Sequence, residues 1–307
     1  MSAPPRKDRR PVVLTEVGLR DGLQLEAAVI PTPDKVALAV AFDQAGYRRI
    51  EVGSFVSPTA LPSMADTGEV MAALRGRVSA ELQVLAANLR GVERAADAGA
   101  DTVNVVVATT ESMNQRNARC TVEDAVGIVD KAARRGGELR VAAILATAFA
   151  CPYEGPVAPA VSLALVDRLL EAGAQRITLA DTVGAAHPAA VSALVAGVRD
   201  RHPDLDLGFH AHDTRGMGLA NALAAIDAGV DGLDSSLGGL GGCPFVGKGA
   251  AGNVASEEVI GLMDDLDLAP GVDLDRIAAC SAYLEDLLGH SLPSRRLALF
   301  KATGSAR

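Results

Sequence analysis

Residues 205–236 have the sequence LDLGFHAHDTRGMGLANALAAIDAGVDGLDSS, which contains one complete strand–helix–strand unit. The apolar run at residues 205–209 predicts a strand, and the pattern of residues 219–228 predicts a helix that Gly229 ends. A second apolar run, at residues 232–236, predicts the next strand. Units of this kind are typical of parallel sheets, so the stretch indicates an α/β fold.

Two histidines, His210 and His212, follow the first strand of this stretch. Residues two apart in an extended chain point to the same face, so we expect the two imidazoles to aim at one point. Imidazole nitrogens are good ligands for divalent metals, which makes the pair a candidate metal site. The alternative is a pair of surface histidines at a strand end. The residues at the other strand ends distinguish the two interpretations.

The same alternation of apolar runs and helical patterns extends over the whole chain. We expect eight strands, near residues 12–17, 49–52, 82–87, 102–108, 139–146, 176–180, 205–209 and 232–236. Eight strand–helix units favour a closed TIM (β/α)8 barrel over a doubly wound open sheet. Thr32 is expected to cap the first helix. Residues 12–307 are expected to form a single domain after a disordered tail at residues 1–11, with a C-terminal helical extension from about residue 273 covering the barrel.

The composition narrows the class of function. The chain has 307 residues, of which 49% are hydrophobic, and a formal net charge of -9 without a basic patch, so no nucleic acid partner is expected. The longest apolar run, residues 141–151, is about half of what a membrane-spanning helix needs, so no membrane partner is expected. The four cysteines are scattered and form no CxxC pair. This fits a reducing compartment and predicts a cytoplasmic protein.

Polar side chains follow five of the eight predicted strands at their C-terminal ends, where barrels of this kind build their active sites. After the first strand, Asp21 can bind a divalent metal as a hard oxygen ligand and Arg20 can stabilise an oxyanion, although a salt-bridged turn is the alternative. Glu51 ends an apolar strand and therefore needs a partner. Asp181 ends the sixth strand, and a glycine-rich loop follows the eighth. The clustering of these groups predicts a catalytic site.

Seven segments resemble the 3-hydroxy-3-methylglutaryl-CoA lyases: EVGLRDGLQLE, IEVGSFVSP, ACPYEG, LADTVG, HAHDTRGMGLAN, DSSLGGLGGCPF and GAAGN. They cover residues 13–258 in the family's order. The RDG and HxHD pieces alone indicate only a wider group of metal-dependent barrel lyases and condensing enzymes, whereas GLGGCP and SFVSP point to the lyase branch. The resemblance implies a carbon–carbon lyase that cleaves an acyl-CoA substrate, 3-hydroxy-3-methylglutaryl-CoA, to acetoacetate and acetyl-CoA.

The resemblance also implies roles for individual residues. It implies Mg²⁺ or Mn²⁺ bound by Asp21, His210, His212 and Asn253, and a metal-assisted retro-Claisen cleavage. The catalytic residues that it implies are Arg20, Asp21, Glu51, Asp181, His210 and Cys243. Arg20 and the metal would offset the charge of the enolate, and Cys243 would protonate its carbon. The base stays open among Asp21, Glu51, Asp181 and a histidine.

The chain departs from the family pattern in three places. Cys243 and Asn253 are ten residues apart where the family usually has nine, and Leu19 and Leu25 replace the usual proline and asparagine. Both replacements are apolar, which suggests an acyl pocket for a bulkier 3-hydroxyacyl group.

Three other functions stay open. They are a lyase on a related 3-hydroxy-3-alkylglutaryl-CoA, an aldolase or condensing enzyme of the same barrel group acting on a 2-oxo acid, and a barrel kept as a scaffold. A homodimer is expected, because such barrels commonly pair. The pathway stays open between leucine degradation, isoprenoid breakdown and a biosynthetic side branch.

Overall fold

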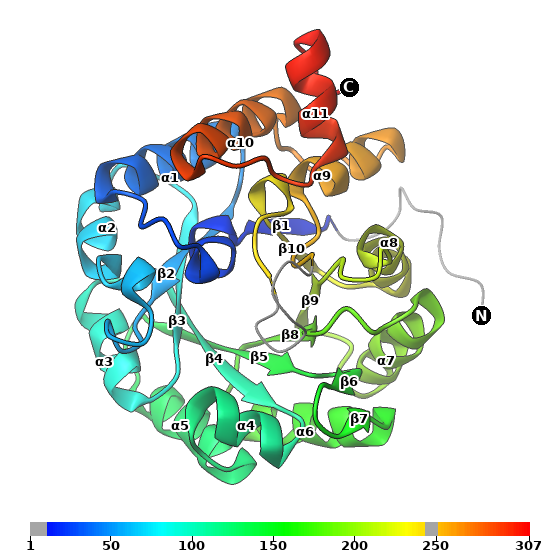
Figure 1. The fold of residues 1–307 in the computed structure, drawn as a ribbon. Coiled ribbons are helices and arrows are strands. Elements are labelled where there is room, and N and C mark those ends of the chain that lie inside the picture. Colours follow the sequence, from blue (N-terminus) through cyan, green and yellow to red (C-terminus); the bar gives the residue numbers. More distant parts are fainter. Residues whose placement is uncertain (1–10, 243–250) are drawn as a thin grey trace.

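The structure is a computed structural model, in which residues 11–242 and 251–307 are described. Within them, eight parallel strands close into a barrel in the order β1-β10-β9-β8-β5-β4-β3-β2 (Figure 1). The strands are β1 (Val13–Glu16), β2 (Arg49–Ser54), β3 (Glu81–Ala86), β4 (Thr102–Ala108), β5 (Arg140–Ala146), β8 (Arg176–Asp181), β9 (Asp206–Ala211) and β10 (Gly232–Ser235). The predicted TIM barrel is confirmed. Residues 1–10 of the predicted tail, and Cys243, lie outside the described residues.

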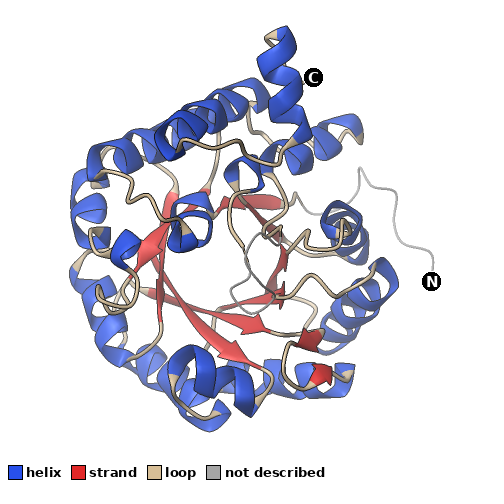
Figure 2. Ribbon diagram, in the orientation of Figure 1, coloured by secondary structure: helices blue, strands red, loops and turns tan. Residues whose placement is uncertain are grey.

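Helices follow the strands and form a ring around the barrel (Figure 2). The helices of this ring that follow strands are α1 (Thr32–Ala45), α2 (Thr67–Leu74), α3 (Leu89–Asp97), α5 (Val122–Arg135), α6 (Pro159–Glu171), α7 (Pro188–Arg201), α8 (Gly218–Ala228) and α9 (Ser256–Asp265). Gly46 ends α1 and Gly229 ends α8 with left-handed φ values of 108° and 100°. A Cβ on Gly46 would lie 2.1 Å from the carbonyl oxygen of Gly271, so only glycine fits there.

Two local features differ from the sequence prediction. Thr32 does not cap α1, because Pro31 holds the N-cap position and the Thr32 hydroxyl donates to Asp66 at 2.8 Å instead. That bond connects α1 to the start of α2. The sequence around Thr32 does not predict it, because Asp66 lies 34 residues away. In addition, the loops after β4 and β5 contain elements that were not predicted, namely α4 (Glu111–Ala118) and a hairpin of β6 (Ala150–Cys151) and β7 (Gly155–Pro156).

The C-terminal extension consists of α10 (Leu274–Leu288) and α11 (Arg295–Thr303). Asp273 caps α10 by accepting the amide of Arg276, and its own amide donates to the last carbonyl of α1, on Ala45, at 2.8 Å. α10 packs between α9 and α1 and so completes the outer ring (Figure 1). The extension also reaches the turn Leu237–Gly239 that follows β10 (Gly232–Ser235), where the amide of Ser294 donates to the carbonyl of Gly238 at 3.1 Å. That it covers the barrel stays a prediction. Within the described ranges, no helix is long and apolar enough to cross a membrane.

Charged side chains fill the N-terminal end of the barrel. Arg49, Glu81, Arg176 and Asp206 are the first residues of β2, β3, β8 and β9, and Arg49 pairs in register with Glu81 and Arg176 with Asp206. Arg176 donates to Glu81 at 3.0 Å and to Asp206 at 2.8 Å, and Arg49 donates to Asp206 at 2.8 Å. Because each buried charge has a partner, this layer is tolerated away from water. The layer closes one end of the barrel.

Candidate active site

A cavity of about 880 Å³ lies at the opposite end, where the C-terminal ends of the strands meet. One part of its wall is polar and includes Arg20, Asp21, Gln24, His210 and His212. Another part is apolar and includes Leu85, Val106, Ile144, Ala146 and Ala180. A cavity of this size, with apolar and polar groups facing the same space, is typical of a site for a small molecule or cofactor.

Three buried side chains converge on the polar part of this wall. Asp21 lies on the helical turn Gly18–Gly22, His210 lies on β9 and His212 directly follows β9. Asp21 Oδ2 is 3.7 Å from Nε2 of each histidine, and the two imidazole centroids are 5.0 Å apart. One ligand atom from each residue lies within 4.8 Å of the others. The expectation that the two imidazoles aim at one point is met, and Asp21 joins them.

Asn253 completes this group from the far end of the chain. It pairs with His212 in an isolated antiparallel bridge, and its Nδ2 donates to Asp21 Oδ2 at 2.9 Å and to the carbonyl of Leu240 at 3.1 Å. Its Oδ1 is buried and has no hydrogen-bond partner among the described residues. An unsatisfied buried acceptor is costly, and a metal ion beside it would satisfy it. The two imidazoles, the carboxylate and this amide oxygen therefore fit a divalent metal.

The charge of Arg20 interacts strongly with the charges of Asp21 and Glu51. Arg20 donates through Nη1 to Asp21 and through Nε to Glu51, the latter at 2.5 Å. Burial opposes the charge on Asp21, but Arg20 and the two histidines hold the pKa of that carboxyl below its usual range. Burial likewise opposes the charge on Arg20, yet Asp21 and Glu51 raise the pKa of the guanidinium. The site thus keeps a fixed cation at the cavity wall, next to the carboxylate that would bind metal.

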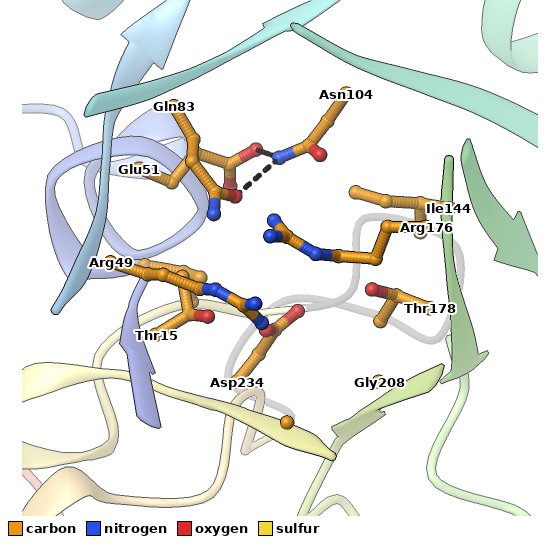
Figure 3. Close-up of a pocket in the computed structure, with 12 residues that line it drawn as sticks. Thr15, Arg49, Glu51, Gln83, Asn104, Ile144, Arg176, Thr178, Gly208 and Asp234 are labelled. Atoms are coloured by element: carbon orange, nitrogen blue, oxygen red, sulfur yellow. Dashed lines mark hydrogen bonds between the residues drawn. The ribbon is translucent and has the colours of Figure 1, made fainter. Parts of the chain in front are cut away.

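Glu51 sits beneath Arg20, inside the barrel. Its other oxygen accepts a hydrogen bond from Asn104 Nδ2 at 2.8 Å, and burial raises the pKa of the Glu51 carboxyl. Figure 3 shows Glu51, Asn104 and Gln83 on one side of a small interior cavity, with Arg49 and Arg176 pointing into it. This cavity of about 10 Å³ has room for roughly one water molecule. Glu51 therefore holds Arg20 from a polar, tightly packed interior.

Asp234 on β10 lies behind His210. Its Oδ2 is 3.3 Å from Nδ1 of His210. Burial opposes a charged imidazole, but this hydrogen bond and the charge of Asp21 raise the pKa of His210. A carboxylate on the far ring nitrogen orients a metal-binding histidine, so Asp234 directs Nε2 of His210 toward Asp21.

One of the expected catalytic residues, Asp181, makes its hydrogen bonds outside this group. Asp181 ends β8, but its carboxylate accepts the backbone amides of Ala185 at 2.9 Å and Ala186 at 3.1 Å, while its neighbours Ala180 and Thr182 line the cavity. Burial raises the pKa of Asp181 against these bonds and against the charges of the two histidines. Through these two hydrogen bonds, Asp181 supports the loop after β8. Cys243 lies outside the described residues.

Three residues of the site were not predicted. Gln24 donates to Asp21 Oδ1 at 3.2 Å, and Asn104 and Asp234 hold Glu51 and His210. Gln24 follows Asp21 by three residues in a helical turn, a spacing that places both on one face. Asn104 and Asp234 are polar residues within otherwise apolar strands, which is a usable signal. Only residues at the ends of strands were taken as candidates, so polar residues within the strands were missed.

Comparisons with known proteins agree with this geometry. The HMGL-like family model matches residues 11–284. A 3-hydroxy-3-isohexenylglutaryl-CoA/hydroxymethylglutaryl-CoA lyase from Pseudomonas aeruginosa is 39% identical over 288 residues, which cover 92% of this chain and 95% of that protein.

Solved structures agree as well. The HMG-CoA lyase of Bacillus subtilis is 33% identical with a TM-score of 0.91, covering 98% of this chain and 100% of that one. An HMG-CoA lyase from Acinetobacter baumannii, solved with coenzyme A and 3-methylmalate, is 36% identical with a TM-score of 0.90, covering 99% and 97%. The family resemblance expected from the motifs is confirmed, and this chain belongs to the HMGL-like family.

Proposed function

We propose that this protein is a carbon–carbon lyase that cleaves 3-hydroxy-3-methylglutaryl-CoA to acetoacetate and acetyl-CoA. The observation that carries the proposal is the convergence of Asp21, His210, His212 and Asn253 with Arg20 at one wall of a large cavity. Relatives of this family are named for that reaction, and the coenzyme A complex of one of them supports an acyl-CoA substrate here.

We propose Mg²⁺ or Mn²⁺ as the metal, with Asp21, His210, His212 and the amide oxygen of Asn253 as its ligands. Hard oxygen donors mixed with imidazole suit these ions. Such an ion would polarise substrate oxygens and lower the pKa of the substrate hydroxyl. The unsatisfied Oδ1 of Asn253 supports this assignment.

Arg20 is the group that we propose for charge stabilisation. Its guanidinium lines the cavity, and Glu51 and Asp21 fix its orientation from two sides. A cation held in place before the reaction offsets negative charge on the thioester oxygen as the C2–C3 bond breaks. Glu51 then acts through Arg20 and is a positioning residue.

The proton transfers need a base and an acid. Asp21 lines the cavity and is the candidate for the base that takes the proton of the 3-hydroxyl. Both ring nitrogens of His210 are already engaged, Nδ1 by Asp234 and Nε2 toward the proposed metal. Asp181 supports the following loop, and we propose no direct step for it. We propose Cys243 as the acid that protonates the enolate carbon, on the family resemblance alone. Gly242, the residue before it, lines the cavity.

A lyase on a substrate with a longer 3-alkyl group is the second candidate. The apolar part of the wall, which includes Val106 and Ile144, faces the same cavity as the polar groups. Leu25 is 45% exposed and also lines the cavity, whereas Leu19 is buried in the core and therefore does not shape an acyl pocket. The Pseudomonas aeruginosa relative is named for both an isohexenyl and a methyl substrate. Each additional buried methylene is worth about 0.8 kcal/mol, or roughly fourfold in binding.

Product analysis tests the two candidates together. The purified protein is incubated with Mg²⁺ and either 3-hydroxy-3-methylglutaryl-CoA or its 3-isohexenyl analogue, and the ketone and acetyl-CoA are quantified. Equal amounts of acetoacetate and acetyl-CoA support the first candidate, and a higher kcat/KM for the isohexenyl substrate supports the second. Release of free coenzyme A without a ketone would contradict both, because it indicates thioester hydrolysis.

Three further expectations stay predictions. We propose a homodimer, which analytical ultracentrifugation tests, and a cytoplasmic location, which cell fractionation tests. The assignment to leucine degradation would need growth on leucine to depend on this protein.

A further inference from the structure

Glu16, the last residue of β1, is fully buried behind the active-site wall. Its Oε1 accepts the backbone amides of Gly18 at 2.8 Å and Leu237 at 2.9 Å. Its Oε2 accepts the hydroxyl of Ser256 at 2.5 Å. One carboxyl group therefore holds three segments of the chain, and two of its partners lie 221 and 240 residues away in sequence.

Each of these three segments leads to a residue of the proposed metal site. Gly18 begins the turn that carries Asp21. Leu237 begins the short helical turn Leu237–Gly239, and the next carbonyl, on Leu240, accepts Nδ2 of Asn253 at 3.1 Å. Ser256 begins α9, three residues after Asn253.

Glu16 thus connects Asp21 on one side with Asn253 on the other. The two ligands meet at 2.9 Å, between Nδ2 of Asn253 and Oδ2 of Asp21, although they come from opposite ends of the chain.

The packing around these connections leaves little room for drift. A Cβ on Gly18 would lie 2.7 Å from Oε1 of Glu16, and a Cβ on Gly241 would lie 2.5 Å from Nδ2 of Asn253. Gly241 also has a φ of 124°, which other residues rarely adopt. The backbone at Gly18 therefore packs directly against Glu16, and the backbone at Gly241 packs directly against Asn253, in addition to the hydrogen bonds.

We propose that Glu16 is a positioning residue that fixes Asp21 and Asn253 relative to each other and so sets the affinity of the metal site. The inference rests on the proposed function, because it takes these residues as ligands. Without the carboxyl group, the buried amides of Gly18 and Leu237 lose their acceptor and the two turns separate. Residues behind the ligands of a metal typically change its affinity by about 10- to 100-fold when they are replaced.

The test measures Mn²⁺ affinity by EPR titration of the full-length, chelator-treated protein. Glu16→Ala and Glu16→Asp should each weaken binding about 10- to 100-fold, because the first has no acceptor and the second is too short to reach all three segments. Glu16→Gln should stay close to the unmodified protein, since its amide oxygen still accepts both backbone amides and its nitrogen can donate to Ser256.

A control that matches Glu16 in its hydrogen-bond pattern, on a half-buried side chain, is available at the other end of the barrel. Asp43 accepts the amides of Ser79 and Ala80 and the hydroxyl of Ser79, at 2.8–2.9 Å, which is the same set of bonds that Glu16 accepts. Asp43→Ala should leave Mn²⁺ affinity unchanged, with folding followed by near-UV circular dichroism for every variant. If Glu16→Ala does not fold, Glu16→Asp decides.

Three results would overturn the inference. Unchanged affinity in a folded Glu16→Ala or Glu16→Asp protein would remove it, as would an equal loss in Asp43→Ala, which would indicate general loosening. Absence of Mn²⁺ binding by the unmodified protein is distinguishable from both, since it removes the proposed metal centre itself and the inference with it.

Discussion

Replacing Glu257 by glutamine should remove a large part of the pH dependence of stability. Glu257 is fully buried, and its carboxyl group accepts the amide of Gly238 at 3.0 Å and the hydroxyl of Ser281. Burial raises the pKa of this carboxyl from 4.5 to about 8, against the effect of these bonds. Between these two pH values the folded chain holds a proton that the unfolded chain has released. The free energy of unfolding therefore falls as pH rises through this window.

The size of the effect follows from the width of the window. Each such group changes the free energy of unfolding by about 1.4 kcal/mol per pH unit, or roughly 5 kcal/mol over the whole window of Glu257. Burial also raises the pKa of Glu16, to about 7, so this residue contributes in the same direction up to that pH. The unmodified protein should lose about 3 kcal/mol per pH unit where both contribute, and Glu257→Gln about half of that. Above about pH 7 Glu16 no longer contributes. The unmodified protein should then continue to lose stability through Glu257, whereas Glu257→Gln should not.

The assay is urea unfolding in the presence of chelator, followed by far-UV circular dichroism at several pH values between about 5 and 8. Groups far from residue 257 act equally on both proteins, so the difference between their slopes reports Glu257 together with its charge coupling to Glu16. Glu93→Gln, an exposed position on α3, is the control and should follow the unmodified protein. An unchanged slope in Glu257→Gln would contradict the raised pKa of Glu257, because this carboxyl would then be ionised in the folded protein.

Three further predictions concern the site. Asn253→Ala should lower Mn²⁺ affinity at least about tenfold in an EPR titration; binding as tight as in the unmodified protein would remove Asn253 from the ligand set. Arg20→Met should reduce kcat by about 10²- to 10³-fold in the acetoacetate assay while Mn²⁺ still binds, as expected for a group that stabilises developing charge. Asp181→Asn should change kcat less than about tenfold, whereas Asp181→Ala should lower the melting temperature because the amides of Ala185 and Ala186 lose their acceptor; a far larger loss of turnover in the asparagine variant would make Asp181 a reacting group.

The strands were predictable where apolar runs have clear boundaries. Residues 102–108 were predicted as a strand and form β4 without a shift, since the run of valines is bounded by polar residues. The strand predicted at 205–209 extends as β9 to Ala211. Its last residues were missed because His210 is polar, and a pattern of apolar residues ends where a functional side chain replaces one.

The face on which a strand-end residue lies was harder to predict. His210 and Asp181 both lie at strand ends, yet His210 faces the cavity and Asp181 faces the following loop. Successive side chains on a strand alternate between faces, so an error of one residue in the alignment of a strand reverses the assignment. The parity of each strand depends on its register in the barrel, which the local sequence does not contain.

Long-range connections were outside the reach of sequence reasoning. Two of the partners of Glu16 lie more than 200 residues away, and Glu51 meets Asn104 only because β2, β3 and β4 are neighbours in register. Three of the proposed metal ligands, Asp21, His210 and His212, were predictable because their residue types and their places at strand ends carry the chemistry themselves, whereas Asn253 was expected only from the family resemblance. The groups that hold them in place are ordinary polar residues, and only the closed barrel assigns them a role.

We infer that the lyase reaction of this protein depends on one metal ion held by Asp21, His210, His212 and Asn253. The most direct measurement is to add Mn²⁺ stepwise to chelator-treated protein while recording bound metal by EPR and acetoacetate formation from 3-hydroxy-3-methylglutaryl-CoA. We expect one tightly bound ion per chain, activity that rises in proportion to the bound metal, and loss of both in His212→Ala. Full acetoacetate formation by the metal-free protein, or metal binding that His212→Ala leaves intact, would contradict this inference.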